Sequence, residues 1–210
     1  GFPAHPHRGF ETVSIVLKGY VDHADSLGVG ARYGQGDVQW LTTGGGIEHG
    51  EMFPLVNTDK PNTMEMFQIW LNLPPEGKSA NPAFEMFWAE EIPVIEKDGT
   101  KVTVIAGAFG DVRPLAPPTD SWASKPENEL AIWLIDIDKS GSITLPTASM
   151  EALRRAYIYE GQANFDGNVL PANHLANLDA SRVTTIRNDR DQRVRILLLQ
   201  SKPIEAPVVA

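Results

Sequence analysis

The chain has 210 residues, of which 42% are hydrophobic and 21% are charged, a composition typical of a globular protein with ample material for a buried core. Its 18 basic and 27 acidic residues give a net charge of −9, which disfavours binding to nucleic acid or to anionic lipid. The absence of cysteine excludes disulfides and iron–sulfur ligation, and no apolar run approaches the ~18 residues of a membrane helix, so we expect a soluble, cytoplasmic protein.

The first part of the chain alternates strand-like segments with turns. Turns are predicted at Lys18-Gly19, at 26–28 and at 33–37, and the Pro-rich segment 73–77 ends the unit. Strands rich in β-branched, aromatic and aliphatic residues are predicted between them, over 12–17, 21–24, 38–41 and 64–73.

The remaining chain repeats this pattern. Asp98-Gly99 predicts a hairpin between two short strands, and the Pro-rich residues 113–126 predict a connector. A short helix is expected over 150–155. Further strands are predicted over 130–137, 156–159, 163–165 and 194–199. The chain is therefore predicted to be all-β, with two similar halves that form a double barrel or double jelly roll.

Two pairs of metal-ligating residue types stand out in the first half. His5 and His7 are two apart, and so are His49 and Glu51. On a β-strand, residues two apart point to the same face. Two such strands facing each other would bring three imidazoles and one carboxylate together, which predicts an open metal site for Fe, Cu, Ni or Zn.

The alternative is that these histidines are ordinary surface or hydrogen-bonded residues. Against it, three of the five histidines fall in the two pairs, and both pairs lie beside glycines and between strand-like segments. Gly44-Gly45-Gly46 is expected to give the backbone a close approach to the metal. The second half has one histidine, His174, with no such companion, so we expect metal only in the first half.

Three motifs resemble those of the pirin family of bicupins, in the family's order and approximate spacing. They lie in the first third of the chain, and the second half matches mainly in layout and in a C-terminal segment. The three motifs are His5-Pro6-His7-Arg8-Gly9-Phe10-Glu11-Thr12-Val13, Gly36-Asp37-Val38-Gln39-Trp40 and Gly46-Ile47-Glu48-His49-Gly50-Glu51-Met52, and the C-terminal segment is Pro203-Ile204-Glu205-Ala206-Pro207-Val208-Val209. Members of the family continue on both sides of this span, so the resemblance implies missing terminal residues.

The resemblance implies a bicupin fold of two jelly-roll barrels in tandem. Residues 1–110 would form the metal-binding barrel and residues 111–210 a barrel without metal. One ion, expected to be Fe(II), with Mn, Ni, Cu and Zn as alternatives, would be held by His5, His7, His49 and Glu51. Glu11 is expected to act from outside the ligand set.

Several bacterial members of the family are similar to quercetin 2,3-dioxygenases, which cleave flavonols with O2 and release carbon monoxide. The resemblance thus implies a flavonol and O2 as partners, with Glu51 as the base that accepts the substrate proton. Four residues are candidate pocket walls, with plain core packing as their alternative role: Phe10, Trp40, Met52 and Phe53.

The competing hypothesis is a protein without enzymatic activity. Some family members are iron-dependent redox sensors that bind a transcription factor or a metabolic enzyme. The acidic charge would suit a basic protein partner, although an acidic surface is ordinary in soluble proteins.

Overall fold

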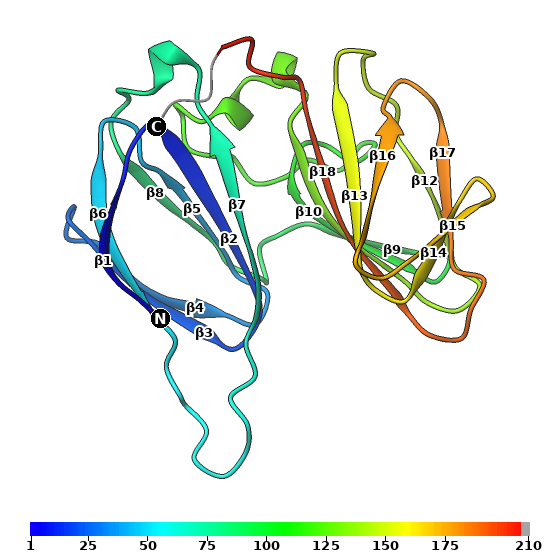
Figure 1. Ribbon diagram of the computed structural model, residues 1–210, viewed down its shortest axis with the longest axis horizontal. Coiled ribbons are helices and arrows are strands. Elements are labelled where there is room, and N and C mark those ends of the chain that lie inside the picture. Colours follow the sequence, from blue (N-terminus) through cyan, green and yellow to red (C-terminus); the bar gives the residue numbers. More distant parts are fainter. Residues whose placement is uncertain (207–210) are drawn as a thin grey trace. The chain divides into compact units, whose positions relative to one another are not determined.

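The structure is a computed structural model that describes residues 1–206, and it consists almost entirely of β-strands (Figure 1). The helical content of the described residues is three single turns of 3-10 helix, namely η1 (Pro75–Gly77), η2 (Trp122–Ser124) and η3 (Pro126–Asn128). No helix in this part of the chain is long and apolar enough to cross a membrane. The prediction of an all-β protein is confirmed; residues 207–209 of the C-terminal motif lie outside the described residues.

The described residues form two compact units. Unit 1 comprises residues 1–91, 116–124 and those described after 203, and unit 2 comprises residues 92–115 and 125–203. The sequence prediction placed a single domain boundary after residue 110. The last two strands before that boundary, β9 (Val94–Lys97) and β10 (Thr100–Ala106), instead belong to unit 2, where β10 hydrogen-bonds along the length of β11 (Ala131–Ile137).

Unit 1 is built from two four-stranded antiparallel sheets, in the orders β1-β6-β3-β4 and β7-β2-β5-β8. The strands of the first sheet are β1 (Phe2–His7), β6 (Ile47–Met52), β3 (Tyr20–Asp25) and β4 (Gly30–Gly34). Those of the second are β7 (Glu65–Asn72), β2 (Phe10–Lys18), β5 (Val38–Thr42) and β8 (Ala83–Phe87).

The core of unit 1 joins these two sheets. Val16 on β2, Val21 on β3 and Tyr33 on β4 form one buried cluster, and burial of such side chains is the main term that holds the sheets together. Strand β2 is buried on both faces over its first seven residues, which explains its nearly continuous run of β-branched and apolar residues.

Gly44 has a role other than the predicted one. Its φ of +46° is in the left-handed region, and a Cβ atom there would lie 2.1 Å from the carbonyl oxygen of Ala80. Glycine is required because two backbone segments meet at this turn. The close approach that Gly44 permits in the structure is thus to the backbone at Ala80.

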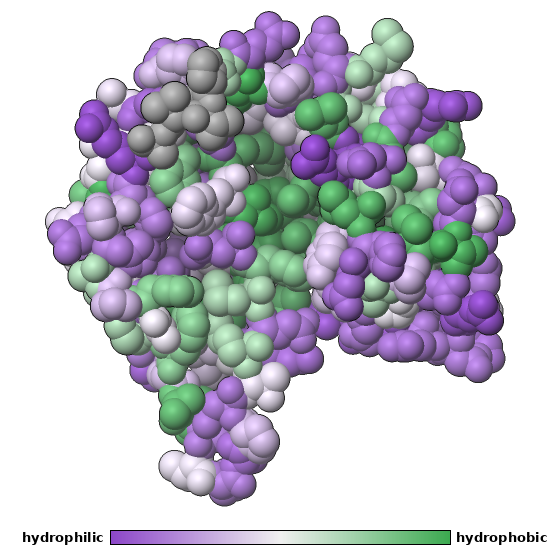
Figure 2. Space-filling model, viewed as in Figure 1, coloured by the Kyte–Doolittle hydropathy of each residue, from purple (hydrophilic) through white to green (hydrophobic). Residues whose placement is uncertain are grey.

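A long loop over residues 53–64 connects β6 to β7 and projects from unit 1 (Figure 1). Figure 2 shows apolar and hydrophilic residues side by side on its surface. Leu55 at 78% and Val56 at 47% are among its exposed apolar side chains.

Unit 2 contains a six-stranded sheet, in the order β16-β13-β18-β11-β10-β9, and a four-stranded sheet, in the order β12-β17-β14-β15. The strands of the larger sheet are β16 (His174–Asp179), β13 (Leu153–Glu160), β18 (Val194–Ser201), β11 (Ala131–Ile137), β10 (Thr100–Ala106) and β9 (Val94–Lys97). Those of the smaller are β12 (Ser142–Leu145), β17 (Thr184–Arg187), β14 (Gln162–Phe165) and β15 (Asn168–Pro171).

One large apolar cluster fills unit 2. It includes Trp133 on β11, Ile158 on β13, Phe165 on β14 and Ile196 on β18. The predicted Asp98-Gly99 hairpin joins β9 to β10, with φ of +50° and +70° at the two turn residues, as a two-residue hairpin turn requires.

The expected helix over 150–155 is absent. Residues 150 and 151 form a turn, and β13 starts at Leu153. Burial alternates along this segment, because Arg154 and Ala156 are buried whereas Leu153 and Arg155 are exposed. A period of two is the pattern of a strand that is buried on one face.

Candidate metal centre

The predicted ligands lie on adjacent strands of one sheet. Strand β6 pairs with β1 on one side, where His49 is opposite His5, and with β3 on the other, where Glu51 is opposite His23. Directly opposed residues of an antiparallel pair point to the same face. The same face of β6 carries the buried residues Ile47, His49 and Glu51, while the residues between them are exposed or half-buried.

Three of the predicted ligands form one compact group. One nitrogen from each of His5, His7 and His49 lies within 4.8 Å of the others. The Nε2 atoms of His5 and His7 are 3.0 Å apart, and the ring of His49 lies 4.5 Å from that of His5 and 4.9 Å from that of His7, between centroids. These rings are close enough to share one cation.

The Nε2 atom of His49 provides the test of whether a metal fits here. This atom is buried and has no hydrogen-bond partner in the protein. His49 as a whole is only 1% exposed, so bulk water does not reach it either. A buried polar atom without a partner is costly and calls for an explanation. A metal bound by neutral imidazole nitrogen would satisfy it.

Glu51 belongs to a second group. Its carboxylate lies within 4.8 Å of ring nitrogens of His23 and His49. Gln68 on β7 donates its Nε2–H to Oε2 at 3.2 Å, and the Tyr33 hydroxyl donates to Oε1 at 3.5 Å. The structure therefore brings Glu51 to His49 but does not place all four predicted residues in a single group at this spacing.

His23 was missed by the sequence reasoning. It lies on β3 with 4% exposure, and its Nδ1 is 3.3 Å from the Nδ1 of His49. The available signal was His23-Ala24-Asp25, which has the same spacing of two as the recognised pairs. Four of the five histidines of the chain thus gather on this sheet.

Burial and neighbouring rings lower the pKa of two of these imidazoles, those of His49 and His7. The pKa of His49 is lowered to about 4, mainly by burial and further by the nearby rings of His23, His7 and His5, with Asp25 opposing the shift. Burial, followed by the charge of His5, also lowers the pKa of His7. A neutral imidazole has the free lone pair that a metal ligand needs.

Glu11 is fully buried and lies in a separate network. Its Oε1 accepts hydrogen bonds from Trp40 Nε1 and Thr42 Oγ1, and its Oε2 accepts from Ser121 Oγ and the backbone N–H of Trp122. Burial raises the pKa of this carboxyl, and the four hydrogen bonds oppose the shift. None of its recorded partners is a predicted ligand, so Glu11 anchors residues 121–122 rather than the histidines.

The four candidate wall residues have different roles. Trp40 is fully buried and serves the core, Met52 lies on the outer face of β6 at 49% exposure, and Phe53 packs on the core cluster of unit 1. Phe10 contacts a predicted ligand, with its ring 5.1 Å from that of His7 between centroids.

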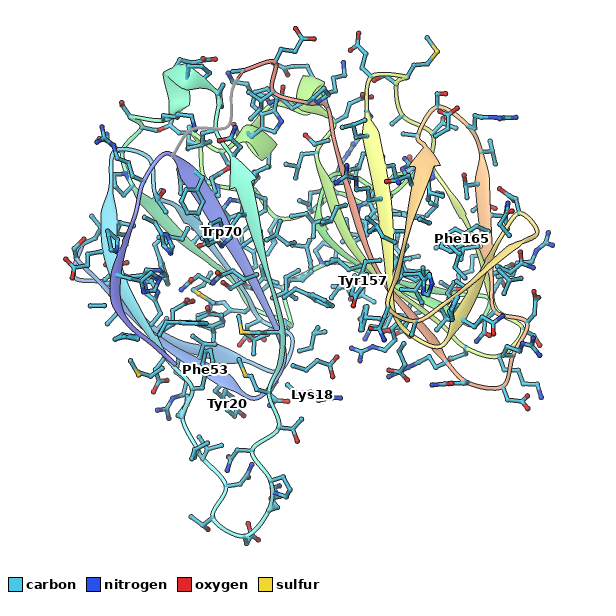
Figure 3. All side chains as sticks on the ribbon, in the orientation of Figure 1. Lys18, Tyr20, Phe53, Trp70, Tyr157 and Phe165 are labelled. Atoms are coloured by element: carbon cyan, nitrogen blue, oxygen red, sulfur yellow. The ribbon has the colours of Figure 1, made fainter. Side chains whose placement is uncertain are left out.

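Trp70 is an aromatic neighbour that the sequence reasoning missed. Its ring lies on β7, 4.8 Å from Phe10 and 5.8 Å from His7 between centroids (Figure 3). It is nevertheless 65% exposed, and its Nε1–H donates to Gln68 Oε1 at 3.1 Å. Only the pairing of β7 with β2, which sets Trp70 beside Thr12, brings it to this place.

His174 lies apart from any such group. It is exposed, and its Nδ1 lies 3.1 Å from the carbonyl oxygen of Ala172. Among the described residues, unit 2 contains no group of three potential metal ligands.

Comparisons with known proteins agree with this architecture. Residues 1–71 match the family described as Pirin, and residues 132–210 match the one described as Pirin C-terminal cupin domain. A Pseudomonas aeruginosa protein with the provisional name quercetin 2,3-dioxygenase is 35% identical over 215 residues, covering 100% of this chain and 71% of that protein. A pirin-like protein of Solanum lycopersicum is 34% identical over 212 residues, covering 100% and 68%.

Solved structures show the same fold. That of a quercetin 2,3-dioxygenase from Acinetobacter baumannii superposes with a TM-score of 0.86 at 29% identity, covering 99% of this chain and 69% of that one. The predicted tandem of cupin domains is thereby confirmed. The chain belongs to the pirin family, whose cupin fold is a metal-binding one.

Proposed function

We propose that this protein is a metal-dependent dioxygenase that cleaves flavonols such as quercetin with O2, working in the cytoplasm. The observation that carries the proposal is the unpartnered Nε2 of His49, which lies in a cluster of imidazoles beside an exposed aromatic surface. The relatives with quercetin dioxygenase names support the same reaction.

In this proposal His5, His7, His49 and Glu51 hold one divalent ion. Three nitrogen donors and one carboxylate, without a thiolate, suit Fe(II), and also Mn, Ni, Cu and Zn. When bound, such an ion would lower the pKa of a hydroxyl group that it coordinates. Glu51 and the pair His5 and His7 lie in separate groups that share His49, so the Glu51 carboxylate would have to move towards them to join one ion.

The protein side chains then have two tasks. Glu51 accepts the proton of the flavonol 3-hydroxyl, while Gln68 keeps the carboxylate oriented through its hydrogen bond to Oε2. Phe10 and Trp70 lie beside His7 and offer flat faces on which the aromatic rings of the substrate stack. The chain Trp70–Gln68–Glu51 links the stacking surface to the base.

Carbon monoxide release from quercetin tests this function. Protein loaded with Fe(II) without oxygen should release carbon monoxide after O2 is admitted, and the other four metals should be compared in the same way. Metal-free protein and His49→Ala should release none above background. Carbon monoxide is the informative product because quercetin also bleaches by autoxidation.

A matched pair of variants tests the stacking surface. Trp70→Ala should raise KM for quercetin about fivefold, since one aromatic contact contributes on the order of 1 kcal/mol. Trp88→Ala changes another exposed tryptophan of unit 1 and should leave KM unchanged.

The carbon monoxide experiment also separates the two hypotheses. Bleaching of quercetin without carbon monoxide above the controls would contradict the dioxygenase and favour the redox-sensing regulator.

A further inference from the structure

Asp25 holds His23 in a fixed and fully buried arrangement beside the candidate metal centre. The Oδ1 atom of Asp25 accepts the backbone N–H groups of Leu27 and Val29, at 2.9 and 3.1 Å. Its Oδ2 lies 3.0 Å from Nε2 of His23, and neither side chain is exposed to solvent. The β3–β4 turn therefore fixes the carboxylate, and the carboxylate fixes the histidine.

This contact determines where the hydrogens lie along the chain of groups. A carboxylate oxygen accepts, so Nε2 of His23 carries a hydrogen and Nδ1 of neutral His23 has a lone pair. The Nδ1 of His49 lies 3.3 Å from that lone pair and donates its hydrogen to it. The Nε2 of His49 is then left with a lone pair, and it is the very atom that has no partner in the protein.

The opposite arrangement has an identifiable cost. If His23 carried hydrogens on both nitrogens, Nδ1 of His49 would have to accept and Nε2 would have to carry the hydrogen. That N–H would be buried without an acceptor, and burying a donor without a partner is unfavourable. The geometry therefore favours one tautomer of His49.

The same contacts argue against His23 as a ligand, although it lies within ligand distance of His49 and Glu51. Both of its nitrogens are engaged, one by Asp25 and the other by His49. Phe84 on the opposite sheet packs on the ring at 5.0 Å between centroids, with the ring planes 35° apart. The ring is thus held from three sides.

We propose that His23 and Asp25 form a positioning pair that orients His49 and keeps its Nε2 free to bind metal. Ligand histidines usually donate their second N–H directly to a carboxylate or carbonyl; here a second imidazole stands between the ligand and the carboxylate. The inference rests on the metal centre proposed above, and it adds the two residues that set its affinity.

The test measures Co(II) binding, by competition with a chelator, in His23→Leu, His23→Gln and Asp25→Asn. Glutamine can accept from His49 with its carbonyl oxygen and donate to Asp25 with its amide, whereas leucine can do neither. We expect His23→Leu to weaken binding by about 10–100-fold, His23→Gln to recover part of that loss, and Asp25→Asn to weaken binding less than His23→Leu. The visible spectrum of bound Co(II) should shift in the leucine variant.

Asp22→Asn is the matched control for Asp25→Asn. Asp22 lies on the same strand, but its side chain is partly exposed and pairs with Arg32, so its loss should change Co(II) affinity less than twofold. Thermal unfolding of the metal-free variants identifies any that fail to fold. If His23→Leu does not fold, the comparison of Asp25→Asn with Asp22→Asn carries the test.

Two outcomes would overturn the inference while the metal centre stands. Equal affinity and spectra in wild type, His23→Leu and Asp25→Asn would show that the pair has no effect on His49. Loss of all binding in His23→Leu, as complete as in His49→Ala, would make His23 a ligand. Failure of the wild-type protein to bind Co(II) would refute the metal centre itself, and this inference with it.

Discussion

The two units share an all-β architecture but fill their interiors differently. On the three adjacent strands β1, β6 and β3, unit 1 buries or half-buries four histidines. Unit 2 fills its interior with aliphatic and aromatic side chains such as Trp133, Ile158 and Ile196. The same all-β architecture thus occurs with either set of buried residues, so the fold alone does not require the buried histidines of unit 1.

The buried polar side chains of unit 1 include the candidate metal ligands. In unit 2, a buried polar side chain instead links strands to one another. Arg154 on β13 is buried, and it donates from Nε to the side-chain oxygen of Gln200 at 2.7 Å and from an Nη atom to the carbonyl of Pro146 at 2.7 Å. These bonds join strand β13 to β18 and to the chain after β12. In the described part of unit 2, no group of three potential metal ligands gathers.

The largest expected effect is loss of metal binding in unit 1. His49→Ala removes the central nitrogen donor of the cluster, so we expect affinity for a divalent ion to fall at least about 1,000-fold, the loss of one strong buried interaction. His174→Ala removes the histidine of unit 2 and should change nothing. Metal content after dialysis measures both, and full occupancy in His49→Ala would contradict the ligand assignment.

A core substitution in unit 2 should have the reverse effect. Ile196 is fully buried on β18 between Ile135 and Ile158, so Ile196→Ala should lower the free energy of unfolding by about 2–5 kcal/mol. Folded Ile196→Ala should still bind one equivalent of metal. Urea unfolding of the metal-free protein, together with metal titration, checks both parts; reduced stoichiometry in the folded variant would break the contrast between the units.

A smaller effect on the free energy of unfolding is expected when the metal-free protein is acidified, because of His49 in unit 1. The pKa of His49 is about 4 in the folded protein, against an ordinary value of 6.5. Between these values the unfolded chain binds a proton that the folded chain does not, so stability rises with pH across this window and is lost as the pH falls from 6.5 towards 4. At about 1.4 kcal/mol per pH unit, the loss from pH 6.5 to 5 reaches about 2 kcal/mol.

Urea unfolding of the metal-free protein at these two pH values measures that loss. The variant His49→Gln keeps a polar side chain of similar size without a titrating ring, so its stability should depend less on pH over this range. His174→Gln is the control and should keep the wild-type dependence. Equal pH dependence in all three proteins would show that His49 titrates normally.

Much of the fold could be predicted from the sequence because the signals are local. Strand-like segments, the Asp98-Gly99 turn and the Pro-rich breaks all depend on neighbouring residues, and the structure agrees with them. The segment 150–155 failed because its apolar and charged residues fit a helix as well as a strand over so short a length. The residues from Leu153 onwards form a strand because β13 pairs with β16 and β18.

The ligand pairs were visible for the same local reason. Residues two apart on a strand share a face whatever the strand pairs with, so His5 with His7 and His49 with Glu51 could be grouped from spacing alone. His23 with Asp25 has that spacing too, but its relevance depends on β3 pairing with β6. Trp70 carries no local signal at all, since it reaches His7 only through the second sheet.

The sequence by itself determined the all-β class, the pirin family and the residues suited to bind a metal. Tertiary structure alone decided how these residues are connected: the register of β3 on β6 sets Asp25 opposite His49 and His23 opposite Glu51, and the return of residues 121–122 satisfies Glu11 from 110 positions away. The physical reason is that side-chain direction is fixed by each strand, whereas contacts between strands depend on register and packing, which no single segment encodes.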